Sequence, residues 1–111
     1  MKTGHRARSL LDMISEAVDE LATVLRDGKA ERQELDAADK LAWRLRHLQK
    51  ELEQDLLRAH YVAIEVINGA ESIGLGRLER WQETGFCPKL SALYGFSLGF
   101  RERSGSREGS T

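Results

Sequence analysis

Cysteine and proline are almost absent from this sequence of 111 residues, which has one of each, Cys87 and Pro88. A single cysteine excludes a disulfide within the chain and fits a reducing compartment. From Leu35 to Ile67 there is neither proline nor glycine. Nothing in the local sequence therefore breaks a helix over that stretch.

Long apolar runs and an excess charge of one sign are also lacking. No stretch approaches the roughly 20 apolar residues that a membrane-spanning helix needs. The chain has 17 Lys and Arg against 18 Asp and Glu, a formal net charge of -1. Nothing then attracts the whole molecule to nucleic acid or to an anionic membrane. The first residues lack the apolar run of a signal peptide, so we expect a cytoplasmic protein with no membrane contact.

The first helix is predicted over residues 9–27, after a flexible lead of residues 1–8. Apolar residues recur there at steps of three and four, the period of an amphipathic helix with one buried face. They are Leu11, Ile14, Val18, Leu21 and Leu25. Gly28 follows as a C-cap, because glycine adopts the left-handed conformation without steric cost.

A second, longer helix is predicted over residues 34–67. Its apolar stripe consists of Ala38, Leu41, Leu45, Leu48, Leu52 and Leu56. Such a helix would be about 50 Å long, against about 28 Å for the first helix. A simple hairpin would leave its far half uncovered. Either the helix breaks near Arg58–His60 and folds back, or the far half packs on the C-terminal segment or on a second copy of the chain.

Residues 61–67 are compatible with two secondary structures. Val62, Ile64 and Val66 alternate with other residues, as in a strand. The alanines before and after this segment continue the helical stripe. We predict a helix, because a lone hydrophobic strand would need pairing partners that the sequence does not offer.

After residue 68, glycines divide the chain into shorter segments. Asn68-Gly69 is the first clear helix stop, and residues 69–76 form a glycine-rich joint. Leu78 and Trp81 indicate a short helix that ends at Gly85. Pro88 then opens another short turn of helix, since proline suits the first helical position.

Beyond this turn, Phe96, Leu98 and Phe100 alternate with Ser and Gly, which predicts extended structure or an apolar arm. Residues 101–111 are rich in Arg, Glu, Gly and Ser and are predicted to be a disordered tail. The predicted fold is therefore mainly α, with one domain over residues 9–100. It is a helical hairpin with a long second helix, short C-terminal helices and a flexible tail.

Few residues could perform catalysis. The histidines are His5, His47 and His60. His47 and Glu51 are one helical turn apart and could supply two metal ligands, but no further pair completes a set. Cys87 lies between Phe86 and Pro88, nothing in the sequence ties it to a histidine, and it is interpreted as a buried structural thiol. We therefore predict no enzyme, no metal site and no cofactor.

Two alternatives to protein binding stay open. In a small helical DNA-binding regulator, Lys40, Arg44, His47 and Lys50 would contact phosphates from one helix face. Acidic neighbours dilute that row of charges, so nucleic acid is not the favoured partner. In a helical enzyme, Arg and Glu side chains of the same helix would lie in the bundle interior, although a solvated charged face explains them as well.

Binding to another protein is the predicted function. Five of the seven aromatic residues lie in the last third of the chain, and interfaces favour aromatic anchors. The far half of the second helix is the other candidate surface, and we assign it to a homodimer. For Trp81 and Phe86, ordinary core packing is an equal explanation. The predicted partner-binding residues are Leu52, Leu56, Val62, Ile64, Ile67, Trp81, Phe86, Tyr94, Phe96 and Phe100.

The plan of the chain resembles that of small helical bacterial anti-activators, such as the quorum-sensing anti-activators of the QslA type in pseudomonads. The resemblance rests on the chain length, the amphipathic helices predicted at 9–27 and 34–67, and the apolar segment after Gly69. It implies a regulator of transcription that binds the ligand-binding domain of a LuxR-type transcription factor and occludes its dimerisation surface. It assigns no individual binding residue.

Overall fold

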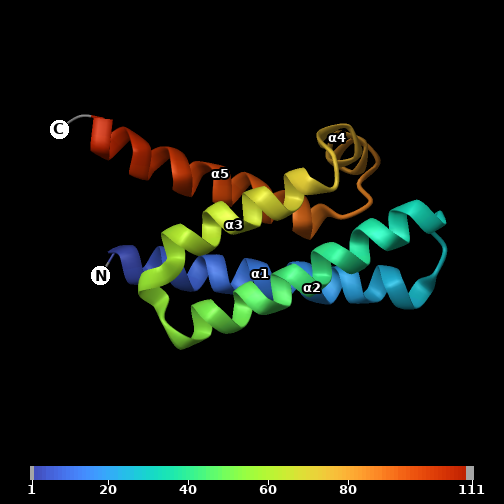
Figure 1. The fold of residues 1–111 in the computed structure, drawn as a ribbon, viewed down its shortest axis with the longest axis horizontal. Helices are drawn as coiled ribbons and strands as arrows, with labels where there is room; N and C mark the ends of the chain where they lie inside the picture. Colours follow the sequence, from blue (N-terminus) through green and yellow to red (C-terminus); the bar gives the residue numbers. More distant parts are fainter. Residues whose placement is uncertain (1, 110–111) are drawn as a thin grey trace.

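The computed structural model describes the backbone of residues 2–109 and the side chains of residues 5–102. Over this part of the chain every regular element is a helix, which confirms the prediction of a mainly α fold (Figure 1). The elements in order are α1 (Lys2–Asp27), α2 (Arg32–Gln54), the 3-10 turn η1 (Leu56–Arg58), α3 (Ala59–Ser72), α4 (Leu75–Thr84) and α5 (Pro88–Gly109).

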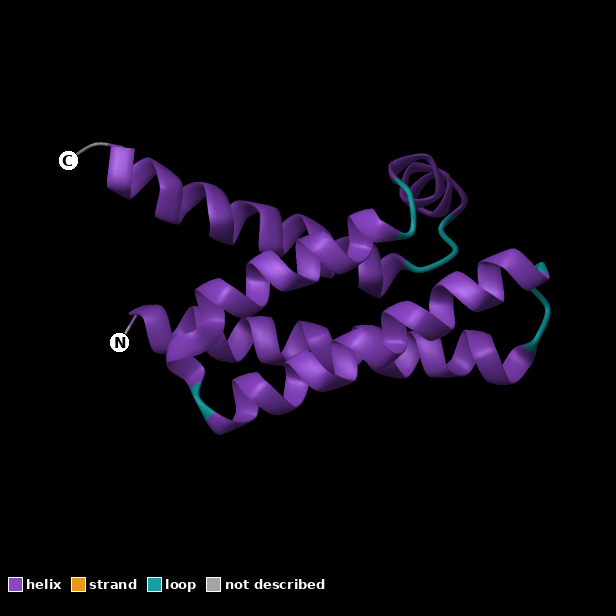
Figure 2. Cartoon of the chain, viewed as in Figure 1, coloured by secondary structure: helices purple, strands orange, loops and turns teal. Residues whose placement is uncertain are grey.

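The four long helices form an antiparallel bundle. α1 packs against α2, α2 against α3, α3 against α5, and α5 closes the ring against α1. Successive long helices run in opposite directions (Figure 2), as in an up-down-up-down bundle. The short α4 lies across the end of the bundle, in the connection between α3 and α5. The molecule is elongated along the bundle axis, with extents of 47 × 27 × 18 Å.

The apolar stripes predicted for the first two helices face the bundle axis. Burial of such stripes removes apolar surface from water and is the main stabilisation of the fold. The largest fully buried side chains are Leu10, Ile14, Leu21, Leu41, Leu45, Leu52, Ile67, Leu90, Leu93, Val62, Val66 and Cys87. All four long helices contribute to this set, so there is one core.

The first helix is longer than its sequence pattern indicates. α1 begins at Lys2 rather than at residue 9, so most of the segment predicted as a flexible lead is helical. Ala7 is fully buried and extends the core-facing stripe by one turn. The helix ends as predicted. Gly28 has a φ of 66°, and its amide donates to the carbonyl of Val24 at 3.1 Å.

The predicted long helix breaks, and the chain folds back, which was one of the two open alternatives. The break lies at Asp55, slightly before the predicted Arg58–His60. Asp55 has an extended backbone, with φ -154° and ψ 102°. Its carboxylate accepts a hydrogen bond from the amide of Leu57 at 3.0 Å, and such local bonds compete with helix continuation. Residues 61–67 are helical, as predicted.

Gly69 does not end a helix, so the predicted stop at Asn68-Gly69 is wrong. α3 continues to Ser72. Gly69 faces α2 at a close approach, because a Cβ added there would lie 2.8 Å from Cδ of Arg44. The small residue lets Arg44 cross over α3 and reach Glu65 at 3.3 Å.

The short helix predicted before Gly85 is present as α4, and Gly85 ends it with a φ of 69°. Pro88 opens a helix as predicted, but this helix has 22 residues and is not a short turn. The extended arm predicted around Phe96 and Phe100 is therefore wrong. Leu93, Ser97 and Phe100 share one helical face and are buried, so tertiary packing outweighs the low helix propensity of the glycines.

The backbone of α5 covers residues 101–109 of the segment predicted as a tail. Residues 110–111 and the side chains of residues 103–109 lie outside the described residues.

Candidate interaction surface

Five of the predicted partner-binding residues are buried inside the bundle and present no surface to a partner in this fold. Leu52 and Val62 are completely covered, and the others are no more than a few per cent exposed. The five are Leu52, Val62, Ile67, Trp81 and Phe100. Because the far half of the predicted long helix folds back as η1 and α3, and α3 packs against α2 and α5, the chain itself covers the surface that was assigned to a homodimer.

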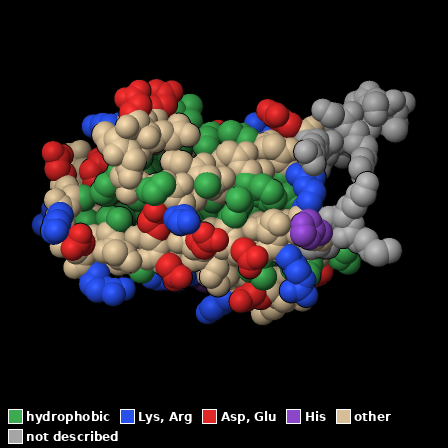
Figure 3. Space-filling view, turned by 180° about the vertical axis from the view of Figure 1, so that it is seen from behind, with side chains coloured by type: hydrophobic (Ala, Val, Ile, Leu, Met, Phe, Trp, Pro, Cys, Tyr) green, Lys and Arg blue, Asp and Glu red, His purple; other side chains and the backbone are tan. Residues whose placement is uncertain are grey.

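The other five residues are half-buried and do not converge on one site. They are Leu56, Ile64, Phe86, Tyr94 and Phe96. Phe86 packs edge-on against Trp81, with ring centroids 5.1 Å apart. Tyr94 donates a hydrogen bond to Glu71 of α3 at 2.9 Å. Figure 3 shows a band of hydrophobic side chains along the back of the molecule, with charged residues around it.

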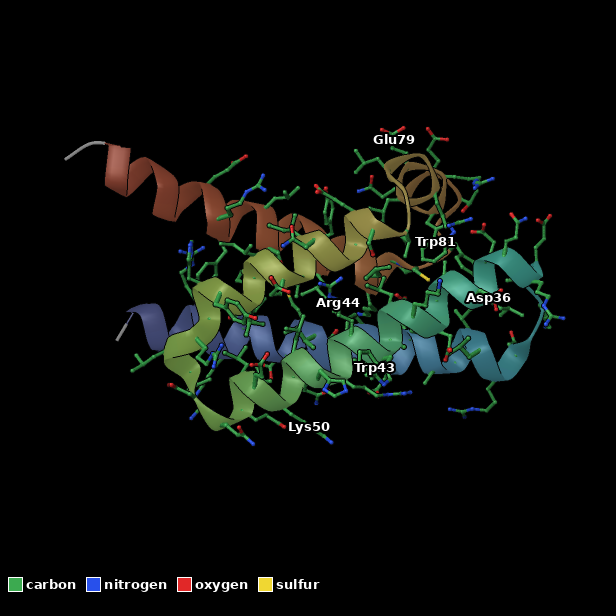
Figure 4. All side chains as sticks on the ribbon, viewed as in Figure 1. Asp36, Trp43, Arg44, Lys50, Glu79 and Trp81 are labelled. Carbon is green, nitrogen blue, oxygen red and sulfur yellow. The ribbon has the colours of Figure 1, made fainter. Side chains whose placement is uncertain are left out.

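The most exposed large apolar side chains are different residues. Trp43 is 63% exposed, Leu57 86%, Tyr61 46% and Leu75 56%. Leu57 lies in η1, Tyr61 near the start of α3, and Leu75 at the start of α4. Trp43, in contrast, lies in the middle of α2, far from either end of the helix (Figure 4). Tryptophan is the residue type most enriched at binding hot spots, so Trp43 marks the strongest candidate surface.

The surroundings of Trp43 are polar and solvent-exposed. Its side chain packs against His47, with ring centroids 4.2 Å apart. We define the Trp43 face as the exposed side chains of α2 within two turns of the tryptophan: Asp36, Asp39, Lys40, Trp43, Arg46, His47 and Lys50. Asp36, Trp43 and Lys50 follow one another along α2 in Figure 4.

The charges of this face are ordered along the helix. Asp36, Asp39 and Lys40 precede Trp43, whereas Arg46 and Lys50 follow it. Within residues 5–102, no ion pair joins any charged side chain of the Trp43 face to another residue. The face thus presents an unburied aromatic ring among charges that have no partner in the described chain.

Neighbouring residues of α2 are engaged within the bundle instead. Arg44 pairs with Glu65 of α3 at 3.3 Å, and Glu51 pairs with Arg58 at 3.6 Å. The basic row considered for DNA binding is therefore interrupted at Arg44. The two possible metal ligands also have different neighbours, because His47 contacts the ring of Trp43 and Glu51 pairs with Arg58.

A second polar cluster connects α2 to α4. The Glu34 carboxylate, whose side chain is 16% exposed, accepts hydrogen bonds from Trp81 and from Arg77, the latter at 3.0 Å. Arg80 lies 3.7 Å away. Burial by itself raises the pKa of Glu34, but these hydrogen bonds and the two guanidinium charges outweigh it and lower the pKa overall.

A shallow pocket of about 310 Å³ lies beside this cluster, between the α1–α2 connection and α4. Lys29 and Glu34 line it from the α1–α2 connection and the start of α2, and Arg80, Trp81 and Phe86 line it from α4 and the residues after it. The Glu34 carboxylate already binds donors of α4. The cluster is therefore best explained as a link between two helices.

Two observations concern residue types that often serve catalysis or metal binding. Cys87 is fully buried, and burial raises the pKa of its thiol to about 12. The thiol is then protonated near neutral pH and is a poor nucleophile. No group of three or more His, Cys, Asp or Glu side chains able to hold a metal ion occurs among the described residues.

Trp43 was not among the residues predicted from the sequence, although a signal for it exists. The buried stripe of α2 runs through Leu41, Leu45 and Leu48. Trp43 does not belong to that stripe and lies on the polar side of the helix. A large apolar side chain there is exposed to water and gains no packing against the core. An aromatic residue on the charged face of an amphipathic helix is thus the pattern to look for.

In the described part of the chain, no helix is long and apolar enough to cross a membrane. Comparisons with models of protein families, with curated proteins and with solved structures give no match to this chain.

Proposed function

We propose that this chain is a small regulatory protein that acts by binding another protein, and that the Trp43 face is its contact surface. The observation that carries the proposal is the 63% exposure of Trp43 on a helix whose leucines are buried, apart from the half-buried Leu35 at its start. Burial of a tryptophan at an interface removes a large apolar area from water, and the surrounding charges then supply orientation and specificity.

The geometry of the face suits one mode of recognition. A regular helix can insert one exposed side into a groove of a partner and use residues at helical spacing as anchors. Trp43 would be the central anchor, with His47 beside it and charges at the rim. Because α2 is held in the bundle, little conformational entropy is lost on binding.

The resemblance to anti-activators adds a specific form of this function. In that form the partner is the ligand-binding domain of a LuxR-type transcription factor. The Trp43 face would occupy the surface through which two such domains associate, and transcription would fall. The contact surface in this proposal is α2, and not the covered region of Leu52 to Ile67.

The test compares three versions of the chain as bait for proteins from the same organism: the wild type, Trp43→Ser and Leu75→Ser. Leu75 is the matched control, because it is a similarly exposed apolar residue on another helix. A hot-spot tryptophan contributes about 2 kcal/mol or more, so we expect Trp43→Ser to weaken capture by about 30-fold or more and Leu75→Ser to change it little. The same set, titrated against a purified LuxR-type ligand-binding domain, tests the specific form. Equal capture by wild type and Trp43→Ser would refute the proposed surface.

A further inference from the structure

The order of charges on the Trp43 face is self-complementary, and we propose that its occupant is a second copy of this chain, docked antiparallel through α2. The proposal rests on the proposed function, since it names the partner of the same face. Its evidence is the placement of the exposed charges around Trp43.

Asp36 lies seven residues before Trp43, and Lys50 lies seven residues after it. Seven residues are almost two helical turns, so both side chains stand within about 20° of the direction of Trp43, roughly 10 Å to either side along the axis. Asp39 and Arg46 lie four residues before and three residues after Trp43. Lys40 also precedes Trp43, so both acids of the face lie on one arm together with one lysine, and the other arm carries only basic residues.

Two such faces match when the second helix runs in the opposite direction. A two-fold axis at Trp43, perpendicular to the helices, brings Asp36 of one copy opposite Lys50 of the second copy. It also brings Asp39 close to Arg46 of the second copy, and the two tryptophans meet at the centre. Symmetry makes each of these pairs occur twice, as in any isologous contact.

The parallel alternative is disfavoured by the same charges. In a parallel pair Asp36 would lie near Asp36 and Lys50 near Lys50, and like charges at a helix–helix contact are destabilising. In the antiparallel pair the only like-charged neighbours are Lys40 and, when it is protonated, His47. The charges therefore select the antiparallel direction.

The size of the face indicates how strongly the copies associate. α2 has 23 residues and is about 34 Å long, so one helix face supplies the whole contact. Such an area falls at or below about 1,200 Å², the range of weak and transient interfaces. We expect a reversible dimer that forms as the concentration of the chain rises.

The experiment is sedimentation velocity of the purified full chain over a wide concentration range at low salt. We expect the wild type to shift toward a dimer with rising concentration, and the shift to shrink in high salt. Asp36→Lys and Lys50→Asp each turn two attractive contacts into repulsive ones. Each alone is expected to weaken association by about tenfold.

The decisive arm mixes the two single variants. The lysine introduced at position 36 of one variant then faces the aspartate introduced at position 50 of the other. The unchanged Lys50 of the first variant faces the unchanged Asp36 of the second, so both pairs are attractive again. We expect the mixture to form a mixed dimer with an affinity close to wild type, although neither variant dimerises well alone. The double variant Asp36→Lys with Lys50→Asp should recover self-association for the same reason.

Glu79→Lys is the matched control for charge, because Glu79 is exposed on α4 and lies outside the Trp43 face (Figure 4). It should leave dimerisation unchanged, and circular dichroism should show every variant to be folded. A chain that stays monomeric at all concentrations, or a mixture that associates no better than its components, overturns the proposal. If the chain is monomeric but Trp43→Ser abolishes its binding to a different protein, then the Trp43 face is a contact surface and only the identity of its partner is wrong. If that substitution has no effect either, the proposed function fails as well.

Discussion

Replacement of Glu34 by glutamine should weaken the connection between α2 and α4. Glu34→Gln keeps the shape of the side chain and one acceptor oxygen but removes its negative charge. In the wild type the carboxylate accepts hydrogen bonds from Trp81 and Arg77, and its side chain is 16% exposed. The amide oxygen can accept from one of these donors, so the other loses its acceptor, and both lose the negative charge.

The magnitude follows from what is lost. A hydrogen bond to a charged group contributes about 1.5–3 kcal/mol to stability, and exposed ion pairs contribute less than about 1 kcal/mol. Arg77 keeps part of its hydration, with a side chain 24% exposed, so we expect a loss near the lower end, about 1.5 kcal/mol. For a chain of this size that corresponds to a fall in Tm of roughly 6–8 °C.

The effect should also depend on pH in a definite direction. The pKa of Glu34 is lowered in the folded state, so the folded chain favours the carboxylate. This stabilisation is fully present above the unfolded pKa of about 4.5, and it is lost as the pH falls through the lower folded pKa. The glutamine variant has no such titration. The difference in stability between wild type and variant should therefore be largest near neutral pH and shrink in acid.

The assay is urea unfolding followed by circular dichroism at several pH values. Glu79→Gln serves as the control, because Glu79 is an exposed carboxylate on the same helix as Trp81, and its change should stay within about 0.5 kcal/mol. Equal stability of wild type and Glu34→Gln at neutral pH, or a difference that does not vary with pH, would refute the role given to this carboxylate.

Three further predictions concern the bundle. Glu20 of α1 accepts hydrogen bonds from the amides of Lys89 and Leu90 at 3.1 and 3.0 Å, so Glu20→Ala should uncap α5 and lower the free energy of unfolding by about 1–2 kcal/mol in denaturant titrations. A loss no larger than that of an exposed control would contradict this capping. Leu45 is fully buried, and Leu45→Ala should cost about 2–5 kcal/mol by the same assay unless the core can collapse around it. The buried Cys87 thiol, with its pKa raised to about 12, should react with a thiol reagent at the rate of chain opening, and reaction as fast as a free thiol would contradict its burial.

Sequence patterns recovered much of the helical plan. The steps of three and four in α1 and α2 mark the residues that face the bundle axis, because a helix buries one side only. Glycine at 28 and 85 correctly marked two helix ends, where a positive φ is required. The break at Asp55 had no such signal, since neither glycine nor proline is present there and the cause is a side-chain bond to the local backbone.

The candidate surface was harder to predict than the helices. Leu52 and Val62 were assigned to a partner because their stripe exceeded the length of the first helix. An apolar stripe must be buried against another segment, but the stripe alone does not show which segment that is. Here α1 and α3 pack against α2, where Leu52 lies, and α5 packs against α3, where Val62 lies. The length of α5 was not expected, because Gly95 and Gly99 have low helix propensity.

The sequence by itself determined that this chain forms amphipathic helices, because periodicity acts locally along the chain, and its single cysteine excludes a disulfide within it. The tertiary structure decided which apolar residues remain in water, because that depends on segments distant in sequence. Folding back at Asp55 and the docking of α5 bury the far half of the predicted long helix. The sequence shows that Trp43 lies off the apolar stripe of its helix. Only the tertiary contacts show that it remains exposed at the surface.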